Sequence, residues 1–467
     1  MRQQQTASIP FSTALRDTFW LSLPLIMSLL ANTGMEFVDT VMLGRLGTTA
    51  LAAGALCGVI FSTVVIIGYG ITSSVGALVA NAVGAQDTQA QAAYVQQGLW
   101  LCVIISVIAW LIFWQTPLLL TLAAQSPEVV ALATPFMRAL MWSVLPMLVF
   151  FGLRELLAAN NITRVILYTA MAGIPVNALL DYVLMFGKWG MPALGVAGAG
   201  IATTTTSFCM VVIIVMFIQR HPQLRQLNLF TPVFFSKPNG RILFELFSLG
   251  WPMGISRGFE VSLFSITSLM MGWIGTIALA AHQIALQCSI VTFMIPLGIA
   301  QATAMRVGRL VGAAEFQSAH QSNHAGIILG LIFSAFTALA FLFFPHALTL
   351  IYIDPHLPAH DQVAYYAARF LAIAALYQCV DAVQVVCNGA LRGAKDTRIP
   401  MLLGLISYWG IGLSSGYLLA FHWHWQGRGL WWGLVLGLLA ASILQYARFR
   451  WRIGQLIRGE RRLLNAT

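Results

Sequence analysis

Long apolar runs, separated by short polar or Gly/Pro-containing segments, follow one another along almost the whole chain. Runs such as 99–114 and 327–344 are too long and continuous for the strands of a membrane barrel, which alternate because the lumen is polar. They match helices of about 20 residues, the length that crosses a bilayer with every backbone hydrogen bond satisfied internally. The pattern therefore predicts an all-α membrane protein with twelve spanning helices, at residues 18–43, 51–80, 93–116, 130–154, 165–187, 194–219, 242–273, 278–303, 323–345, 363–389, 398–421 and 428–448.

The longest polar gap, residues 219–241, lies near the middle of the chain and has little hydrophobic periodicity. A gap of this kind is expected between two six-helix halves. The sequence therefore predicts an N-lobe at 1–219 with helices 1–6 and a cytoplasmic connector at 220–241. A C-lobe follows at 242–467, with helices 7–12 and a basic C-terminal tail.

The two halves also resemble each other when the first is shifted by 228 residues. Pro24 then falls on Pro252, Gly70 on Gly298, and the run 50–53 on the identical run 278–281. Six helices in each half give both halves the same orientation in the membrane, so the repeat is parallel. Parallel repeats build transporters that open a central cavity alternately to each side of the membrane.

Composition excludes a soluble protein, because 59% of residues are hydrophobic and 9% are charged, against about 25% charged in an ordinary globular chain. The net charge of +10 is explained by loop placement, so we expect no nucleic-acid partner. Nineteen Lys and Arg residues, Arg2 among them, flank one side of the predicted helices and three flank the other. The positive-inside rule then places both termini in the cytoplasm. The expected location is the inner (cytoplasmic) membrane, with the lipid bilayer as the surrounding partner.

Five acids remain inside the predicted spans, namely Glu36, Asp39, Asp181, Glu260 and Asp381. Each costs about 3 kcal/mol at the bilayer centre unless it is paired, protonated or hydrated, so such residues are functional candidates. The alternative is a structural hydrogen-bonded pair.

In the first half, the acids fall on two helices. Glu36 and Asp39 are three residues apart and Asn177 and Asp181 are four apart, so each pair shares one helix face. If the first and fifth helices meet, Asp39, Asn177 and Asp181 form an oxygen-rich cluster. Such a cluster would exchange a proton or bind a small hard cation. Glu36 is the weaker member of the set.

In the second half, Tyr377 lies one turn before Asp381 and offers a hydroxyl or a ring face to a cation. Arg257 precedes Glu260 by three residues, so a salt bridge between them is an alternative to cation binding by Glu260. The acids of the two halves do not coincide under the 228-residue shift, which favours two distinct sites.

No metalloprotease, Walker, nucleophile-elbow or dinucleotide-binding motif occurs in the chain. We therefore expect neither an enzyme nor a resident cofactor, and no catalytic residue or metal site other than Na⁺ at the acidic positions. Transport against a gradient would then be driven by an ion gradient.

Three segments resemble one known family, the multidrug and toxic compound extrusion (MATE) family in its NorM branch. Residues 34–42 resemble its first-helix signature, 259–264 its seventh-helix segment and 376–384 its tenth. The resemblance covers essentially the whole chain. It implies a V-shaped antiporter of two pseudo-symmetric six-helix lobes that exports small cationic amphipathic drugs and dyes in exchange for H⁺ and/or Na⁺.

The same resemblance implies roles for individual residues. Glu260, Tyr377 and Asp381 would form the C-lobe cation site, and Asp39 the N-lobe site. Residues 177–181 resemble the fifth-helix motif of the DinF-like and archaeal members, in which an Asn and an Asp join the first-helix Asp and a sixth-helix Thr. Thr203 is the best match to that Thr. Because both lobes carry a site, the coupling ion stays open between sodium, protons or both.

Two other functions stay open at this point. A lipid or lipid-linked oligosaccharide flippase of the same superfamily is one, although such proteins often carry a basic cavity. A passive channel or membrane receptor is another, disfavoured by the repeat and the paired intramembrane acids. We expect a monomer.

Overall fold

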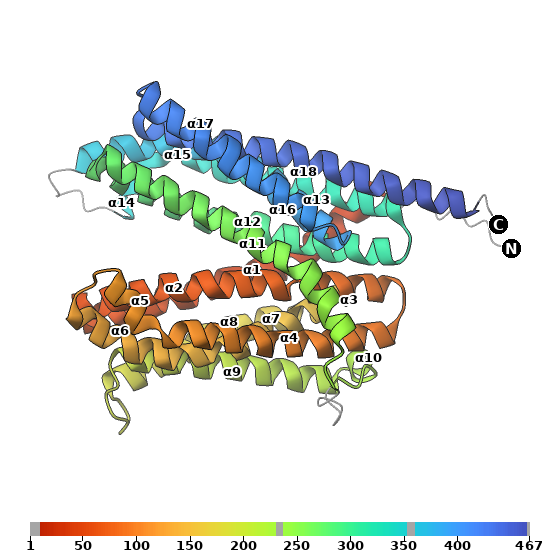
Figure 1. The fold of residues 1–467 in the computed structure, drawn as a ribbon, viewed down its shortest axis with the longest axis horizontal. Helices are drawn as coiled ribbons and strands as arrows, with labels where there is room; N and C mark the ends of the chain where they lie inside the picture. Colours follow the sequence, from red (N-terminus) through yellow and green to blue (C-terminus); the bar gives the residue numbers. More distant parts are fainter. Residues whose placement is uncertain (1–9, 230–236, 353–359, 465–467) are drawn as a thin grey trace. The chain divides into compact units, whose positions relative to one another are not determined.

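A computed structural model describes residues 10–229, 237–352 and 360–464, and these residues form helices joined by short connections (Figure 1). Arg2 and residues 230–236 of the predicted connector lie outside the described residues. The chain packs as two compact units, one of Met27–Gly254 and one that combines Met1–Ile26 with Ile255–Thr467. Each unit is described by itself below.

The unit Met27–Gly254 contains most of α1, followed by helices whose long members run side by side (Figure 1). Its helices are α1 (Phe11–Leu46), α2 (Thr48–Thr72), α3 (Ser74–Gly84), α4 (Thr88–Trp114), α5 (Thr116–Leu122), α6 (Pro127–Leu140), the 3₁₀ turn η1 (Met141–Ser143), α7 (Val144–Ala159), α8 (Arg164–Phe186), α9 (Val196–Arg220), α10 (Pro222–Arg225) and the first part of α11 (Gly240–Ile274).

The second unit is also made of helices, among which α15 and α18 are long. It holds the start of α1, the rest of α11, and α12 (Thr276–Gly312), α13 (Phe316–Phe343), α14 (Pro345–Leu350), α15 (His360–Gly393), α16 (Arg398–Leu405), η3 (Ile406–Leu413), α17 (Ser414–Tyr417), η4 (Leu418–His422) and α18 (Gln426–Leu464). The aromatic core of this unit includes Phe370 and Trp431, both fully buried.

The predicted helical membrane protein is confirmed. Eleven helical segments of the described chain are long and apolar enough to cross a membrane. The remaining predicted span, 242–273, is covered by the 35-residue helix α11, which carries Arg257 and Glu260 in its interior. The short helices α5, α10 and α14 were not predicted, because helices of four to seven residues leave no periodic pattern.

Two of the predicted spans are not uniform α-helices. The span predicted at 51–80 is divided at Ser73 between α2 and α3. The span predicted at 398–421 contains two π-helical segments, η3 and η4. Between them, in α17, Gly416 approaches α18 so closely that a Cβ on Gly433 would lie 2.3 Å from the Gly416 Cα, and glycine allows this approach of the two backbones.

The 228-residue repeat is visible in the packing. The two units divide after Ile26, inside α1, and after Gly254, inside α11, and these positions differ by 228. In one unit a Cβ on Gly70 would lie 2.6 Å from Gly254 Cα, and in the other a Cβ on Gly298 would lie 2.9 Å from Ile26 N. Adding 228 to the numbers of Gly70 and Ile26 gives Gly298 and Gly254, so the two contacts are equivalent under the repeat. Both α1 and α11 therefore contribute to both units.

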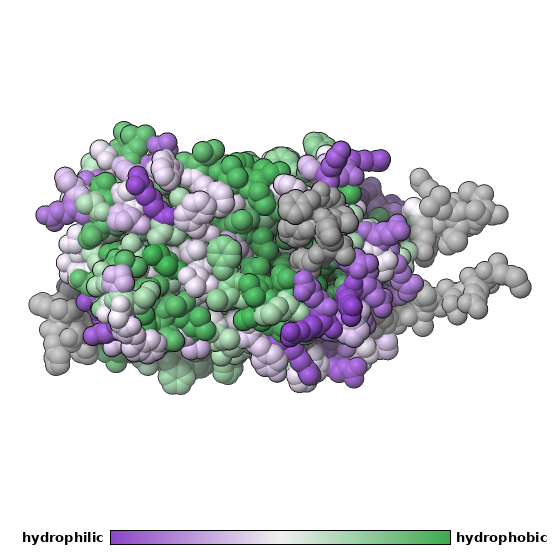
Figure 2. Space-filling model, turned by 90° about the horizontal axis from the view of Figure 1, so that it is seen from below, coloured by the Kyte–Doolittle hydropathy of each residue, from purple (hydrophilic) through white to green (hydrophobic). Residues whose placement is uncertain are grey.

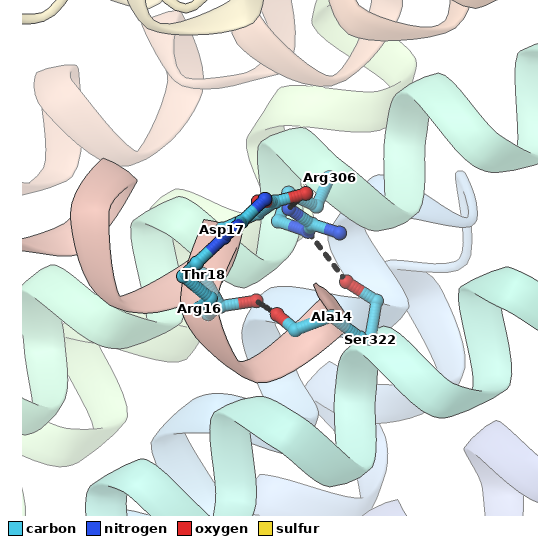
Figure 3. Close-up of polar contacts among 6 residues, drawn as sticks. All are labelled: Ala14, Arg16, Asp17, Thr18, Arg306 and Ser322. Atoms are coloured by element: carbon cyan, nitrogen blue, oxygen red, sulfur yellow. Dashed lines mark hydrogen bonds and ion pairs between the residues drawn. The ribbon is translucent and has the colours of Figure 1, made fainter. Parts of the chain in front are cut away.

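The start of α1 is attached to its unit by an ion pair. Arg306 Nη1 of α12 lies 3.1 Å from Asp17 Oδ2, and Arg306 Nε donates to Ser322 Oγ of α13 at 3.1 Å (Figure 3). Because Arg306 is buried while Asp17 is partly exposed, the hydrogen bond to Ser322 satisfies a group that water does not reach. These contacts join α1 to the C-terminal part of α12 and the N-terminal part of α13.

The surface matches a membrane environment. The face seen in Figure 2 has hydrophobic residues over its middle and gathers hydrophilic residues at its ends, mainly the right-hand one. This distribution places polar side chains where headgroups and water would lie and apolar ones along the hydrocarbon.

Candidate functional site

Three helices of the unit Met27–Gly254 bring the predicted first-half residues together. Asp39 comes from α1, Asn177 and Asp181 from α8, and Thr203 from α9. Thr203 Oγ1 donates to Asp39 Oδ2 at 3.3 Å. The side chains of Asp181 and Asn177 also interact with the Asp39 carboxylate. The first and fifth predicted spans, which are α1 and α8, therefore meet at these residues.

The cluster has more acceptors than donors. Asp39 Oδ1, both carboxylate oxygens of Asp181 and Asn177 Oδ1 are buried and lack a hydrogen-bond partner among the described residues. Asp181 and Asn177 are almost completely buried, and Asp39 is half-buried. Two ionised carboxylates in contact repel each other, so a shared proton or a bound cation would satisfy both. Oxygen donors of this kind suit small hard cations such as Na⁺.

A cavity of about 430 Å³ opens beside this cluster. Asp39, Asn177 and Thr203 line it, and so does Glu36 from the preceding turn of α1. Glu36 is exposed and lies near enough to Asp39 for their charges to interact. The structure thus places Glu36 in the cavity wall, whereas Asp181 lies behind it.

The rest of the wall is mainly apolar and rich in methionine and phenylalanine. Its members include Met35, Met147, Met210, Phe61, Phe136, Phe150 and Phe151. The described lining contains two acids and no Lys or Arg. Polarisable thioethers and ring faces beside a negative group are typical of sites that bind cations with a planar, largely apolar body. Composition alone did not identify these residues, since many other methionines and phenylalanines face lipid.

In the second unit, Glu260 is already paired. Arg257 Nη1 donates to Glu260 Oε2 at 2.7 Å, within one turn of α11. Their side chains are 22% and 19% exposed, so this is a partly buried ion pair. The salt-bridge alternative for Glu260 is therefore the arrangement that the structure contains.

The other two predicted residues lie close to that pair. Asp381 is buried on α15, and both Glu260 and Arg257 act on it electrostatically. The ring of Tyr377, one turn earlier, contacts Trp431 edge-on with centroids 5.9 Å apart. Tyr377 also lies within electrostatic range of Asp381 and Glu260, so the three residues form one group.

Sequence reasoning missed one member of this group. Tyr408, in the π-helical segment η3, is 2% exposed and lies within electrostatic range of Glu260, Asp381 and Arg257. A tyrosine inside an apolar run gives no signal by itself. The π-helical geometry, which is frequent at functional sites, becomes visible only in the structure.

Comparisons with known proteins agree on one family. The family model MatE matches residues 24–183 and 252–418. The chain is 37% identical to a probable multidrug resistance protein NorM of Rhizobium meliloti, over 96% of this chain and 94% of that protein. It is also 37% identical to the multidrug resistance protein NorM of Burkholderia vietnamiensis, over 98% of both chains.

Solved structures show the same fold. The eukaryotic MATE transporter AtDTX14 superposes with a TM-score of 0.82 at 18% identity, covering 96% of this chain and 98% of that one. The Vibrio cholerae MATE transporter VcmN in its bent form superposes with a TM-score of 0.84 at 19% identity, covering 96% and 98%. Likeness at such low identity reports the arrangement of the helices and leaves the substrate undefined.

Proposed function

The chain belongs to the MatE family, and from this premise we propose that it is a cation-coupled antiporter working by alternating access. It is a multidrug efflux transporter of the NorM type, and not an enzyme. The observation that carries the coupling proposal is the interaction between half-buried Asp39 and buried Asp181, with acceptor oxygens that lack donors among the described residues, beside a cavity of about 430 Å³.

We propose that Asp39 and Asp181 bind the coupling ion together. The contact between two carboxylates favours any ligand that supplies positive charge between them, either a proton or Na⁺. Asn177 and Thr203 support this assignment, because they orient Asp39 without neutralising it. Glu36, on the cavity wall, would contact the substrate cation.

Coupling follows from linkage between ion and substrate. A substrate cation bound beside Asp39 and an ion bound at Asp39–Asp181 use the same negative charge. Each therefore weakens the binding of the other, and the weakening is reciprocal. Ion binding from outside then expels substrate, and substrate binding from inside expels the ion.

In the second unit, we propose that Asp381 and Tyr377 form a second cation site in which Arg257 limits the contribution of Glu260. The 2.7 Å ion pair supports this division of roles. The site would bind a monovalent cation weakly while Arg257 is paired with Glu260.

The substrates that we propose are cationic and amphipathic. The apolar, sulfur- and ring-bearing cavity wall supports them, as do its two acids. A flippase for anionic lipid-linked sugars is less favoured, because such a headgroup would meet these acids and no basic residue of the described lining.

We also propose that the protein is a monomer in the inner membrane with both termini cytoplasmic, and that its two functional lobes are residues 1–219 and 242–467. The distribution of Lys and Arg, nineteen against three, supports the orientation.

Uptake into proteoliposomes tests the coupling. Purified protein is reconstituted, and movement of ethidium, a fluorescent cation, is followed under a pH gradient or a sodium gradient imposed separately. Asp39→Asn should abolish transport under whichever gradient drives the unmodified protein. Glu128→Gln, an exposed acid in the first turn of α6, is the matched control and should transport normally. Full transport by Asp39→Asn would overturn the assignment.

A further inference from the structure

A second cavity, of about 520 Å³, lies in the unit that contains α12 and α18, and its described lining does not include Glu260 or Asp381. It is formed where α11 ends and where α12 and α18 begin. Arg306 and Arg309 lie near the other end of the 37-residue helix α12. The cavity is therefore at the end of this unit opposite the end that carries Arg306 and Arg309.

The charged groups around this cavity are positive. Arg369 and Arg428 line it together with His424, Gln362 and Gln426, and the described lining contains no Asp or Glu. Arg369 and Arg428 are exposed, as is Asp361, the acid next to Gln362, which is not part of the lining. Two guanidinium groups without an opposing carboxylate in the wall favour an anionic ligand.

Backbone donors add to these side chains. Residues 276–278, the first turn of α12, line the cavity, and their N–H groups have no acceptor within the helix. The preceding residue, Gly275, makes no side-chain cap hydrogen bond, and a Cβ there would have nothing within 4 Å. Residues 426–428, the first turn of α18, also line the cavity. Two helix starts and two arginines thus surround one cavity.

The turn before α18 is held in a strained shape. His424 and Gln426 have positive φ angles of 58° and 50°, a region that residues with a Cβ rarely adopt. A Cβ on Gly427 would lie 2.5 Å from Phe370 Cζ, so only glycine allows this turn to close on the aromatic core. Strain of this kind persists where the surrounding structure maintains it, often at ligand sites.

Exposed aromatic rings mark this end of the unit as a membrane boundary. Trp423 is 61% exposed, Trp425 44% and Trp273 69%. Tyr365 is half exposed, and the Arg369 guanidinium lies 4.2 Å from its ring centroid. Tryptophan and tyrosine gather at the level of lipid headgroups. Phosphate groups of phospholipids lie at that level of a membrane.

From this arrangement we propose that the cavity lined by Arg369, Arg428 and the first turns of α12 and α18 binds a phosphate group. Phosphate is supplied there either by the headgroup of an anionic phospholipid or by free inorganic phosphate. The lipid is favoured by the exposed tryptophans and by the position of the cavity at the membrane boundary. The proposal concerns a site separate from the transported cation, so it stands independently of the coupling proposal.

Binding to the purified full chain in detergent tests the proposal. Short-chain phosphatidylglycerol, short-chain phosphatidylcholine and inorganic phosphate are titrated separately by calorimetry. Arg369→Gln and Arg428→Gln should each weaken binding by about tenfold or more, because each removes a charge-assisted hydrogen bond. Arg45→Gln, an exposed arginine in the last turn of α1, is the matched control and should bind as the unmodified protein does.

The outcomes separate the two sources of phosphate. Tighter binding of phosphatidylglycerol than of phosphatidylcholine, lost in both Gln variants, supports a lipid headgroup site. Binding of inorganic phosphate alone, lost in the same variants, supports a site for free phosphate. Absence of binding by the unmodified chain, or equal binding by the Gln variants, overturns the proposal. Arg369→Lys and Arg428→Lys keep the charge, so they should bind more tightly than the Gln variants and provide folded variants if the latter aggregate.

Discussion

Asp181→Asn is the sharpest test of the paired carboxylates, because it changes the charge of a buried side chain and hardly its shape. Asp181 is fully buried, and both its carboxylate oxygens lack a partner among the described residues. The new amide would donate a hydrogen bond to Asp39, the carboxylate with which Asp181 now interacts. The variant should fold, insert into the membrane and keep the cavity.

The expected magnitude follows from the repulsion that the substitution removes. Two ionised carboxylates roughly 4 Å apart repel each other by about 4 kcal/mol at an effective dielectric of 20. This repulsion favours a bound proton or Na⁺ by up to about a thousandfold. Since Asp39 is only half-buried, solvent screening reduces the repulsion, and we expect transport to fall by at least about tenfold.

Two assays report the loss. Proteoliposomes containing Asp181→Asn should accumulate ethidium slowly under the gradient that drives the unmodified protein. In detergent, substrate addition should release fewer protons into weakly buffered solution, or displace less sodium. The reasoning is refuted if Asp181→Asn transports and releases ions normally while Asp39→Asn is inactive. In that case Asp39 would work alone, and its contact with Asp181 would be structural.

Two further variants test the ion pair in the second unit and the packing of the repeat. Arg257→Gln removes the partner of Glu260, and loss of a positive charge roughly 5 Å from a bound cation stabilises that cation by up to about 3 kcal/mol at a dielectric of 20. A sodium titration should therefore saturate at lower concentration, whereas an unchanged curve would show that Arg257 does not limit this site. Gly298→Val places a methyl-bearing carbon 2.4 Å from Ile26 Cγ1 and should destabilise the fold by about 1–3 kcal/mol. Its thermal unfolding midpoint should fall, whereas that of Gly258→Val, with nothing within 4 Å of its Cβ, should change much less; equal shifts would contradict the close α1–α12 approach.

Much of the fold was predictable because membrane insertion imposes a local rule. An apolar run must be long enough to cross the bilayer and must satisfy its own backbone, so its length and composition identify it without knowledge of its neighbours. Eleven of the twelve predicted spans meet this rule in the described structure, and α11 covers the twelfth. The divisions at Ser73 and at the π-helical segments were not predictable, since they depend on packing against other helices.

The candidate residues were identifiable for a related reason. A carboxylate in an apolar run is costly wherever the helix lies, so Asp39, Asp181 and Asp381 stood out before any contact was known. Their partners did not stand out. That Thr203 donates to Asp39, or that Tyr408 lies near Asp381, depends on which helix faces meet.

The sequence by itself determined that this protein is a helical membrane protein with a parallel internal repeat, acids within the membrane and the motifs of one transporter family. These properties follow from local hydropathy and from the order of residues along the chain. Only the tertiary structure decided that α1 and α11 each contribute to both units, that Glu260 is paired with Arg257, and that a cavity lies beside Asp39. Contacts between residues distant along the chain arise from side-chain packing, which no single segment specifies.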